Sequence, residues 1–417
     1  MARTSRKELL LSLERQRLTL ADSIVLTPTD SIPFVLADRE HTAFLHGLYI
    51  SDKVRDRQTQ RDAIVQFAGR GAAARDIAAI HRLFADALGG AEGSLRLLAG
   101  LQAHTATFMS IAMIGQTVML LSEEAGGHYN THAILDRLGL QTIDMPIDRQ
   151  RLCIDRPAAL ALIEQVQPDF VFIDRSEGLR YEDFSFIGQL KGPTTVFDAS
   201  QYLAQILTDR YQSPLAWGFD LMLFTLHKSF PGPQKAAIVA REDGEVWARL
   251  VRGLSTLVSS SHAENTYLAG LALLRGQWLE SYCGRMLETA VALEEELKRR
   301  GVHVISRERQ GLAHWPATHH IWIAASSQDE AFEQYEALAK INVQVNYRLL
   351  PYGLGYGLRL GTTACSIAGV GPECACELAD IIHQALTHNT QTALRERVRC
   401  LARAARADAI LPVQHWT

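Results

Sequence analysis

The chain has 417 residues, of which 47% are hydrophobic and 7% are aromatic, and its formal net charge at pH 7 is −4. This length allows a large hydrophobic core and predicts two domains. Acidic and basic residues are mixed along the chain, which argues against a nucleic-acid partner. We find no signal-like apolar segment and no stretch long enough to span a bilayer, so we expect a cytoplasmic protein that does not use a membrane.

Six cysteines are scattered along the chain, and Cys374-Ala-Cys376 has no second ligand pair at the spacing of a zinc site. We therefore expect reduced thiols that mostly fill the core, and no metal site.

The N-terminal region has two features. Residues 7–20 carry leucines at helical spacing, which predicts an amphipathic helix whose apolar side packs on a partner subunit. Residues 25–33 are extended, interrupted by proline and rich in hydroxyl groups, which fits either a linker or a loop on the substrate side.

From residue 74 onward, apolar runs alternate with helix-like segments. This alternation predicts an α/β fold with a mostly parallel sheet and crossover helices. The predicted strands are 94–98, 117–122, 140–145, 169–174, 194–198, 219–226 and 236–240, followed by strands 302–305, 319–324 and 342–346. The predicted helices are 74–88, a helical block over 265–300, 328–340 and 371–387. We expect an N-terminal arm (1–45), a large domain (46–290), a small α+β domain (291–390) and a helical tail (391–417).

Two of the predicted strands lead into side chains that could take part in catalysis. Asp198 ends one apolar run and Lys228 follows another, and ligands of α/β sheets bind beyond the carboxyl ends of the strands. Pyridoxal phosphate requires such a pair, because a lysine forms the Schiff base and a carboxylate keeps the ring nitrogen protonated. Taken singly, Asp198 could instead be a helix-capping aspartate and Lys228 a surface lysine.

Two further segments fit the same cofactor. Residues 100–107 precede an apolar helix expected over Phe108–Gly115, and small or hydroxyl residues at a helix N-terminus make a phosphate site. Gly126 and Gly127 allow close backbone approach to a ligand, and His128 would present its imidazole to a flat ring. Alone, these are an ordinary helix cap and a structural loop histidine.

Five motifs together resemble those of the serine hydroxymethyltransferases, a family of fold-type-I pyridoxal phosphate enzymes, over roughly residues 20 to 390. They are Gln102-Ala-His-Thr-Ala-Thr107, Gly126-Gly-His-Tyr-Asn-Thr-His132, Asp198-Ala-Ser-Gln201, Thr225-Leu-His-Lys-Ser-Phe-Pro-Gly-Pro233 and Gly357-Leu-Arg-Leu-Gly-Thr362. Their order and spacing are those of the family.

The resemblance implies a role for each matching residue. Lys228 is the Schiff-base lysine, Asp198 contacts the pyridine nitrogen, and His128 stacks on the ring and helps direct bond cleavage. Arg359 binds the amino acid carboxylate. The remaining implied cofactor contacts are Thr105, Ala106 and Thr107 at the phosphate, Ser176 and Gln201 near the phenolic oxygen, and Thr225 and His227 beside the lysine. Thr29 and Ser31 are expected at the substrate. In a homodimer, Tyr49 and the loop 259–261 are expected to reach the partner's site.

The chain departs from the family where folate and the hydroxymethyl group bind. Gln201 stands in place of a histidine, and the glutamate of the family's Tyr-Ala-Glu-Gly is replaced by the shorter, shifted Asp52. Glu123 and Tyr129 replace apolar folate contacts, and the segment between Asn346 and Arg359 is several residues shorter. The pterin pocket is therefore not expected to be intact.

We therefore expect a pyridoxal phosphate enzyme that cleaves or forms the Cα–Cβ bond of a small β-hydroxy amino acid or glycine, as a folate-independent aldolase or threonine transaldolase with an aldehyde acceptor. The alternatives are folate-dependent hydroxymethyl transfer, another reaction of the same cofactor (decarboxylation, racemisation or transamination), and a pseudoenzyme. The candidate general bases are Asp52, Asp30, His128 and His104.

Overall fold

The computed structural model describes residues 5–308, 316–387 and 391–410. Two compact units make up the chain: residues 33–279 with 314–316 form one, and residues 1–32, 280–313 and 317–417 form the other. We call them the sheet unit and the terminal unit. The domain boundaries expected from the sequence stay a prediction.

A seven-stranded sheet organises the sheet unit, in the order β2-β10-β9-β8-β7-β3-β4. Strands β4, β3, β7, β8 and β9 are parallel neighbours, and β10 runs antiparallel to both β9 and β2. The strands are β2 (Glu92–Ser94), β3 (Thr117–Leu120), β4 (Gln141–Asp144), β7 (Phe170–Asp174), β8 (Thr194–Asp198), β9 (Leu221–Thr225) and β10 (Ala236–Ala240). The short hairpin of β5 (Ile147–Asp148) and β6 (Cys153–Ile154) is separate.

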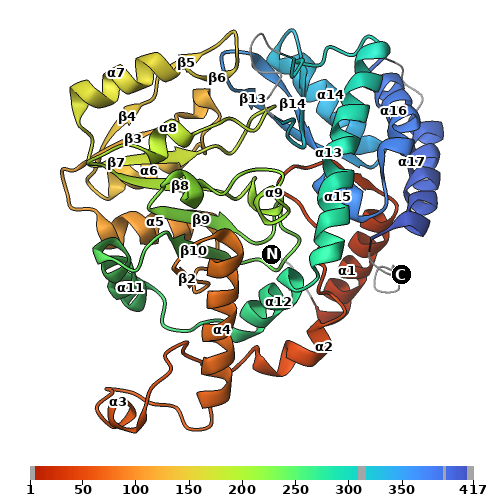
Figure 1. Cartoon of the computed structure of the whole chain (residues 1–417). Coiled ribbons are helices and arrows are strands. Elements are labelled where there is room, and N and C mark those ends of the chain that lie inside the picture. The colour runs from red at the N-terminus through yellow and green to blue at the C-terminus, as the bar shows by residue number, and fades with distance from the viewer. Residues whose placement is uncertain (1–4, 309–315, 388–390, 411–417) are drawn as a thin grey trace. The chain divides into compact units, whose positions relative to one another are not determined.

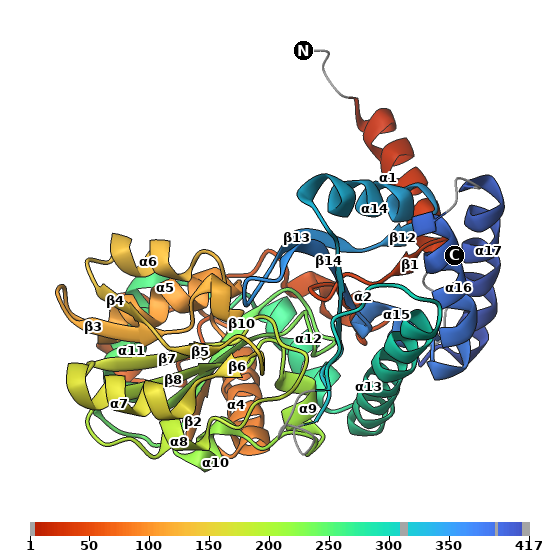
Figure 2. The same ribbon diagram turned by 90° about the horizontal axis from the view of Figure 1, so that it is seen from above.

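Helices cover both faces of this sheet, as Figure 2 shows with α5 and α6 on one face and α7, α8 and α10 on the other. This explains why every residue of β7, β9 and β10 is buried, as expected for central strands covered on two sides. The helices of the unit are α2 (Arg39–Thr42), α3 (Arg57–Arg61), α4 (Gly71–Leu88), α5 (Gly100–Ile111), α6 (Thr131–Arg137), α7 (Arg156–Val166), α8 (Ser185–Gly188), α9 (Leu203–Leu207), α10 (Pro214–Trp217), α11 (Glu245–Leu257) and α12 (Ala263–Leu273), with short 3₁₀ turns at 43–45 and 123–125.

In the terminal unit, a three-stranded antiparallel sheet of order β11-β14-β13 packs with helices around an aliphatic core. Strand β1 pairs in parallel with β12 beside it. Its elements are α1 (Arg6–Ala21), β1 (Ile24–Val25), the main part of α13 (Gly276–Arg299), β11 (His320–Ala324), α14 (Gln328–Lys340), β12 (Val343–Gln344), β13 (Asn346–Leu350), β14 (Gly355–Gly361), α15 (Thr363–Ile367), α16 (Ala375–Thr387) and α17 (Gln391–Ala405), with 3₁₀ turns at 372–374 and 406–408 (Figure 1).

Three strand predictions were wrong in detail. Residues 302–305 form no strand, because only Val304 bridges to Ile323. The strand expected over 342–346 is two short strands, since Asn346 begins β13 after β12 has ended. The strand expected over 94–98 is β2, which ends at Ser94.

Among the described residues, no helix is both long and apolar enough to cross a membrane. All six cysteines lie in the described part of the chain, and none of them forms a disulfide.

Candidate active site

The carboxyl ends of three neighbouring parallel strands bring the candidate residues together. Asp174 ends β7 and Asp198 ends β8, and the two are direct partners in the register of the sheet. Lys228 follows β9, the next strand along. Since ligands of α/β sheets bind at this edge, the predicted acid and amine emerge where a cofactor can meet both.

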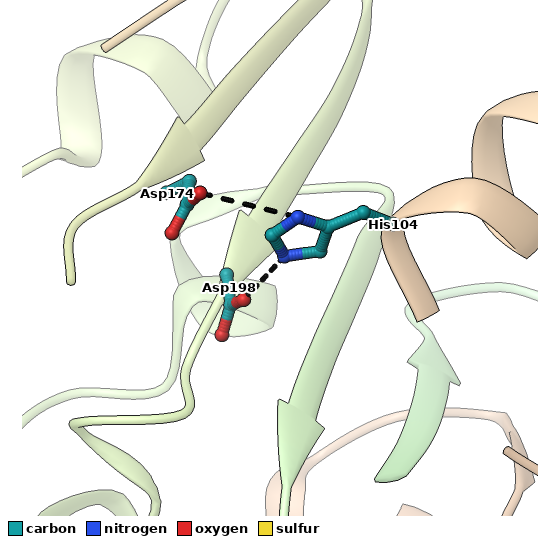
Figure 3. A group of neighbouring side chains, drawn as sticks. All are labelled: His104, Asp174 and Asp198. Atoms are coloured by element: carbon teal, nitrogen blue, oxygen red, sulfur yellow. Dashed lines mark hydrogen bonds and ion pairs between the residues drawn. The ribbon is translucent and has the colours of Figure 1, made fainter. Parts of the chain in front are cut away.

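His104 of α5 bridges the two aspartates (Figure 3). Its Nε2 lies 2.7 Å from Asp198 Oδ2, and its Nδ1 lies 4.0 Å from Asp174 Oδ2. The imidazole is only 2% exposed, and burial alone would lower its pKa, but the charge of Asp174 and the hydrogen bond with Asp198 raise the pKa above its usual value. The favoured state is therefore an imidazolium between two carboxylates.

Asp198 is held in its ionised form by this contact. Burial would raise the pKa of its carboxyl group, but the hydrogen bond from His104 and the charges of His104 and Lys228 hold the pKa below its usual value. The backbone N–H of Ser200 also donates to Oδ1, at 2.7 Å. Each carboxylate oxygen has two lone pairs, so Asp198 can accept a further hydrogen bond from a protonated ring nitrogen.

The same three side chains could also surround a metal ion, because one ligand atom from each lies within 4.8 Å of the others. In this structure, however, His104 Nε2 lies directly against the Asp198 carboxylate. That hydrogen bond engages two of the three side chains that a metal would need.

Asp174 organises the loop that carries His128. Its Oδ2 accepts hydrogen bonds from the backbone N–H of His128, at 3.2 Å, and from the Thr131 hydroxyl, at 2.7 Å. Gly126 has a φ of +83°, and a Cβ there would lie 2.4 Å from the carbonyl oxygen of Glu177. Only glycine fits that position, which is the physical reason for the first glycine of the motif.

His128 is placed as a neutral ring. Burial lowers the pKa of its imidazole, and the charges of His104 and Lys228 lower it further. Its Nδ1 accepts the backbone N–H of Asn130 at 3.2 Å, so the neutral ring carries its hydrogen on Nε2. The Tyr129 ring stacks on it with centroids 4.7 Å apart and planes inclined by 19°, so Tyr129 covers one face of the imidazole.

The helix expected to begin at Phe108 begins at Gly100 instead, and this prediction was wrong. Thr105, Ala106 and Thr107 therefore lie beyond the first turn, and the Thr105 hydroxyl donates to the carbonyl oxygen of Leu101 at 2.9 Å. Ala103 is the first residue whose N–H bonds within the helix, to the carbonyl oxygen of Ala99. The N–H groups that an anion can reach are thus those of residues 100–102.

The end of β9 adds polar groups beside that helix terminus. A Cβ on Gly100 would lie 3.0 Å from Cγ2 of Thr225, so helix and strand approach closely. Among the described residues, the buried hydroxyl of Thr225 and the buried Nδ1 of His227 have no hydrogen-bond partner. Burial, with the charge of Lys228, lowers the pKa of His227 to about 4. Orphaned polar atoms around an uncapped helix end fit a bound phosphate group.

The other predicted residues of the sheet unit lie in different settings. The Ser176 hydroxyl donates to Asp174 Oδ1 at 3.1 Å, and Gln201 is buried just after β8. The Tyr49 hydroxyl donates to the carbonyl oxygen of Ser259 at 2.7 Å. Arg96 binds the Asp52 carboxylate with two nitrogens; burial would raise the pKa of Asp52, but this pairing holds it below its usual value.

The remaining predicted residues belong to the terminal unit. Arg359 lies on β14, and its Nη2 donates to Asn346 Oδ1 at 3.0 Å; burial lowers the pKa of its guanidinium to about 10. The Thr29 hydroxyl lies 3.4 Å from Asp30 Oδ1, and Ser31 Oγ is buried. Their roles at the substrate stay predictions.

Sequence reasoning gave no role to Asp174 or Thr131, and it considered His104 only as one of four possible bases. A signal for Asp174 was available, because it ends an apolar run just as Asp198 does. The contact with His104 depends on the sheet register and on the start of α5, which no local pattern reveals.

Comparisons with known proteins agree with this geometry. No protein-family model matches the chain. A serine hydroxymethyltransferase of Pyrobaculum islandicum is 27% identical over 319 residues, which cover 74% of this chain and 73% of that relative. An L-threonine:uridine-5'-aldehyde transaldolase of a Streptomyces species is 30% identical over 299 residues, which cover 69% of this chain and 68% of that relative.

The chain belongs to the serine hydroxymethyltransferase-like family of pyridoxal phosphate enzymes. The predicted resemblance and the predicted enzyme class are thereby confirmed.

The fold of this family member is also confirmed. Its structure matches the crystal structure of L-threonine transaldolase from Pseudomonas fluorescens in the internal aldimine state, with a TM-score of 0.87 and 19% sequence identity, over 97% of this chain and 92% of that one. The predicted α/β, fold-type-I architecture is therefore correct.

Proposed function

We propose that the chain binds pyridoxal phosphate at the strand-end site and, without folate, breaks and forms the Cα–Cβ bond of a small β-hydroxy amino acid. The observation that carries the proposal is the group formed by Asp198, His104 and Lys228 at the ends of neighbouring strands. The Asp198 carboxylate, whose pKa is lowered by its hydrogen bond with the buried His104, lies at the edge of the sheet from which the lysine also emerges.

The side chains of the site match the parts of this cofactor. Lys228 would hold its aldehyde carbon and Asp198 its ring nitrogen, while His128 would stack on the ring with the face that Tyr129 does not cover. The first turn of α5, rather than residues 105–107, would bind the phosphate group together with the Thr225 hydroxyl. When bound, the cofactor supplies an electron sink that stabilises negative charge on the substrate Cα.

The chain's own groups have three tasks in this reaction. Asp198 keeps the ring nitrogen protonated, since the pKa of its carboxyl group is low. With a substrate bound, the amine of Lys228 would be available for proton transfer. His128 can donate a hydrogen bond from Nε2 to the oxygen of an aldehyde as the Cα–Cβ bond forms.

The candidate proton acceptors for the β-hydroxyl group differ in the pKa and in the hydrogen-bond partners of their side chains. Asp52 is the weaker base, because the ion pair with Arg96 lowers the pKa of its carboxyl group. His104 is a poor acceptor for this proton, because its Nε2 is hydrogen-bonded to Asp198 and its pKa is raised. His128 is neutral, but its Nδ1 already accepts the N–H of Asn130 and its Nε2 carries the hydrogen, so it has no lone pair for this proton. Burial raises the pKa of Asp30 in the terminal unit, so Asp30 stays the better candidate.

Two local features favour an aldehyde acceptor over folate. Strands β13 and β14 are joined by only four residues, 351–354, so the segment that contacts folate in the family is a tight hairpin here. Glu123 and Tyr129, at positions that are apolar in the family, are solvent-accessible on the loop before and after Gly126. A charged and a phenolic side chain would have to be desolvated to hold a pterin.

Relatives named transaldolases support the same choice. Relatives named serine hydroxymethyltransferases support the alternative, in which serine and glycine are interconverted with tetrahydrofolate. One assay separates the two: purified protein is incubated with threonine or serine and a panel of aldehydes, with and without tetrahydrofolate. We expect acetaldehyde release from threonine and a new β-hydroxy amino acid without folate. Strict dependence on tetrahydrofolate would replace the proposal by the alternative.

We further propose a homodimer in the cytoplasm in which Tyr49 and residues 259–261 reach the partner's site. The outward-facing leucines of α1 support an arm that packs on a second copy, since six of them are at least 42% exposed. Sedimentation of the purified protein tests the dimer, and a monomer at working concentration would contradict it.

A further inference from the structure

A cavity lies in the sheet unit, at the N-terminal end of α4. Its volume is about 250 Å³, and its walls come from residues 49–71, the first turn of α4 and the end of α11. Figure 1 shows α3 and its flanking loops beyond this end of α4, away from the sheet. Five basic side chains line it: Lys53, Arg55, Arg70, Arg75 and Arg96.

Most of these positive charges have no acid partner among the residues that the structure describes. Only Arg96 is ion-paired, with Asp52. Arg55 donates to two neutral oxygens, the Val65 carbonyl at 3.1 Å and Gln66 Oε1 at 2.8 Å. Nε of Arg70 is buried and, within the described ranges, has no hydrogen-bond acceptor.

The nearby carboxylates serve other groups and do not line the cavity. Asp56 caps α3 by accepting the Thr59 N–H at 2.8 Å, and Asp62 accepts from Gln58 at 2.7 Å. Asp76 accepts the hydroxyl of Tyr267 at 2.6 Å. The cavity therefore carries a positive charge that the surrounding chain does not neutralise.

The α4 terminus adds to this charge. Its N-cap residue, Arg70, makes no side-chain capping hydrogen bond, and Gly71 and Ala74 of the first turn line the cavity. The first N–H groups of a helix and its dipole attract anions. The cavity is thus lined both by guanidinium groups without an acid partner among the described residues and by the uncapped N-terminus of an 18-residue helix.

One wall of the cavity is apolar. The rings of Tyr49 and Phe67 are in contact, with centroids 4.8 Å apart, and Val54 and Val65 are each more than half exposed. Such exposed apolar groups beside cations suit a small organic molecule with an anionic end.

We propose that this cavity binds a small organic anion, a phosphate or carboxylate, through Arg70, Arg75 and Lys53.

Direct binding tests the anion site without any turnover. Inorganic phosphate and glycolaldehyde phosphate are titrated calorimetrically into the holoenzyme, the double variant Arg70→Gln/Arg75→Gln and the control Arg82→Gln. Arg82 lies on the same helix but contacts Ala91 and Glu92 outside the cavity. Losing two guanidinium contacts should weaken both ligands by about 10-fold or more, with the control unchanged. Equal affinities in the double variant, with its cofactor absorbance intact, would overturn the site.

Discussion

Charged side chains gather in two places within the sheet unit, and the two groups differ in how their charges are compensated. At the strand ends, His104 lies between Asp174 and Asp198, and all three are less than 7% exposed. In the cavity at α4, the charges of Lys53 and Arg75 are exposed to solvent, without an acid partner in the described residues.

This difference follows from the cost of burying charge. An unpaired ion in the interior costs several kcal/mol, so the strand-end group exists only as a hydrogen-bonded set. An exposed cation keeps its hydration and can stay unpaired at little cost. The strand ends are thus preorganised for a ring that needs one fixed negative charge, whereas the cavity is left open for an anion that arrives from solution.

The largest expected effect is that of Lys228→Ala. This change removes the amine that would hold the cofactor, so we expect activity to fall by more than about 10³-fold. The absorbance band of the protein-bound cofactor should disappear with it. Lys191→Ala is the control, because Lys191 is an exposed lysine of the same unit. Retention of the band and of activity in the Lys228 variant would place the chemistry elsewhere.

Asp198→Asn should have the next largest effect. The amide cannot keep a ring nitrogen protonated, and we expect kcat to fall about 10²-fold or more. The same change removes a hydrogen bond that raises the pKa of His104, so that pKa should fall. NMR titration of the imidazole measures the shift. An unchanged pKa would mean that the two side chains are not in contact in solution.

Some secondary-structure elements could be predicted closely from the sequence, and others could not. The predicted strands 169–174, 194–198 and 236–240 match β7, β8 and β10 to within one residue, because short apolar runs bounded by polar or turn residues are typical of strands buried on both faces. The start of α5 was misplaced, because Gly100 and its neighbours offer no polar N-cap, whereas Thr105 and Thr107 resemble one.

Likewise, some features of the candidate site could be predicted from the sequence and others could not. The positions of Asp198 and Lys228 after strands could be predicted, because each lies at the end of its own local pattern. The bridging role of His104 and the unpaired state of Arg70 could not, because both depend on which side chains meet from distant segments. Sequence patterns report periodicity, and the pairing of charges is a tertiary property.

His104→Gln should destabilise the protein in a pH-dependent way. The folded-state pKa of His104 is raised, so its stabilisation is fully present below the unfolded pKa of about 6.5 and is lost as pH rises through the folded-state pKa. Breaking this buried pair should cost about 3 kcal/mol at low pH. Urea unfolding of both proteins across pH 6 to 9 measures the difference, which should shrink with increasing pH. A constant difference would point to lost packing alone.

The substitution Arg70→Gln should have the smallest effect, and it should stabilise the protein rather than destabilise it. If the cavity charges repel one another and lack partners, removing one should raise the free energy of unfolding slightly, by up to about 0.5 kcal/mol. Added phosphate should stabilise the wild-type protein more than this variant, because a ligand that binds only the folded state stabilises in proportion to its affinity. Arg82→Gln breaks the ion pair with Glu92, so this control should be neutral or slightly destabilised. A clear loss of stability in Arg70→Gln without phosphate would show that this guanidinium already has a structural partner, and the contrast between the two charge groups would then no longer hold.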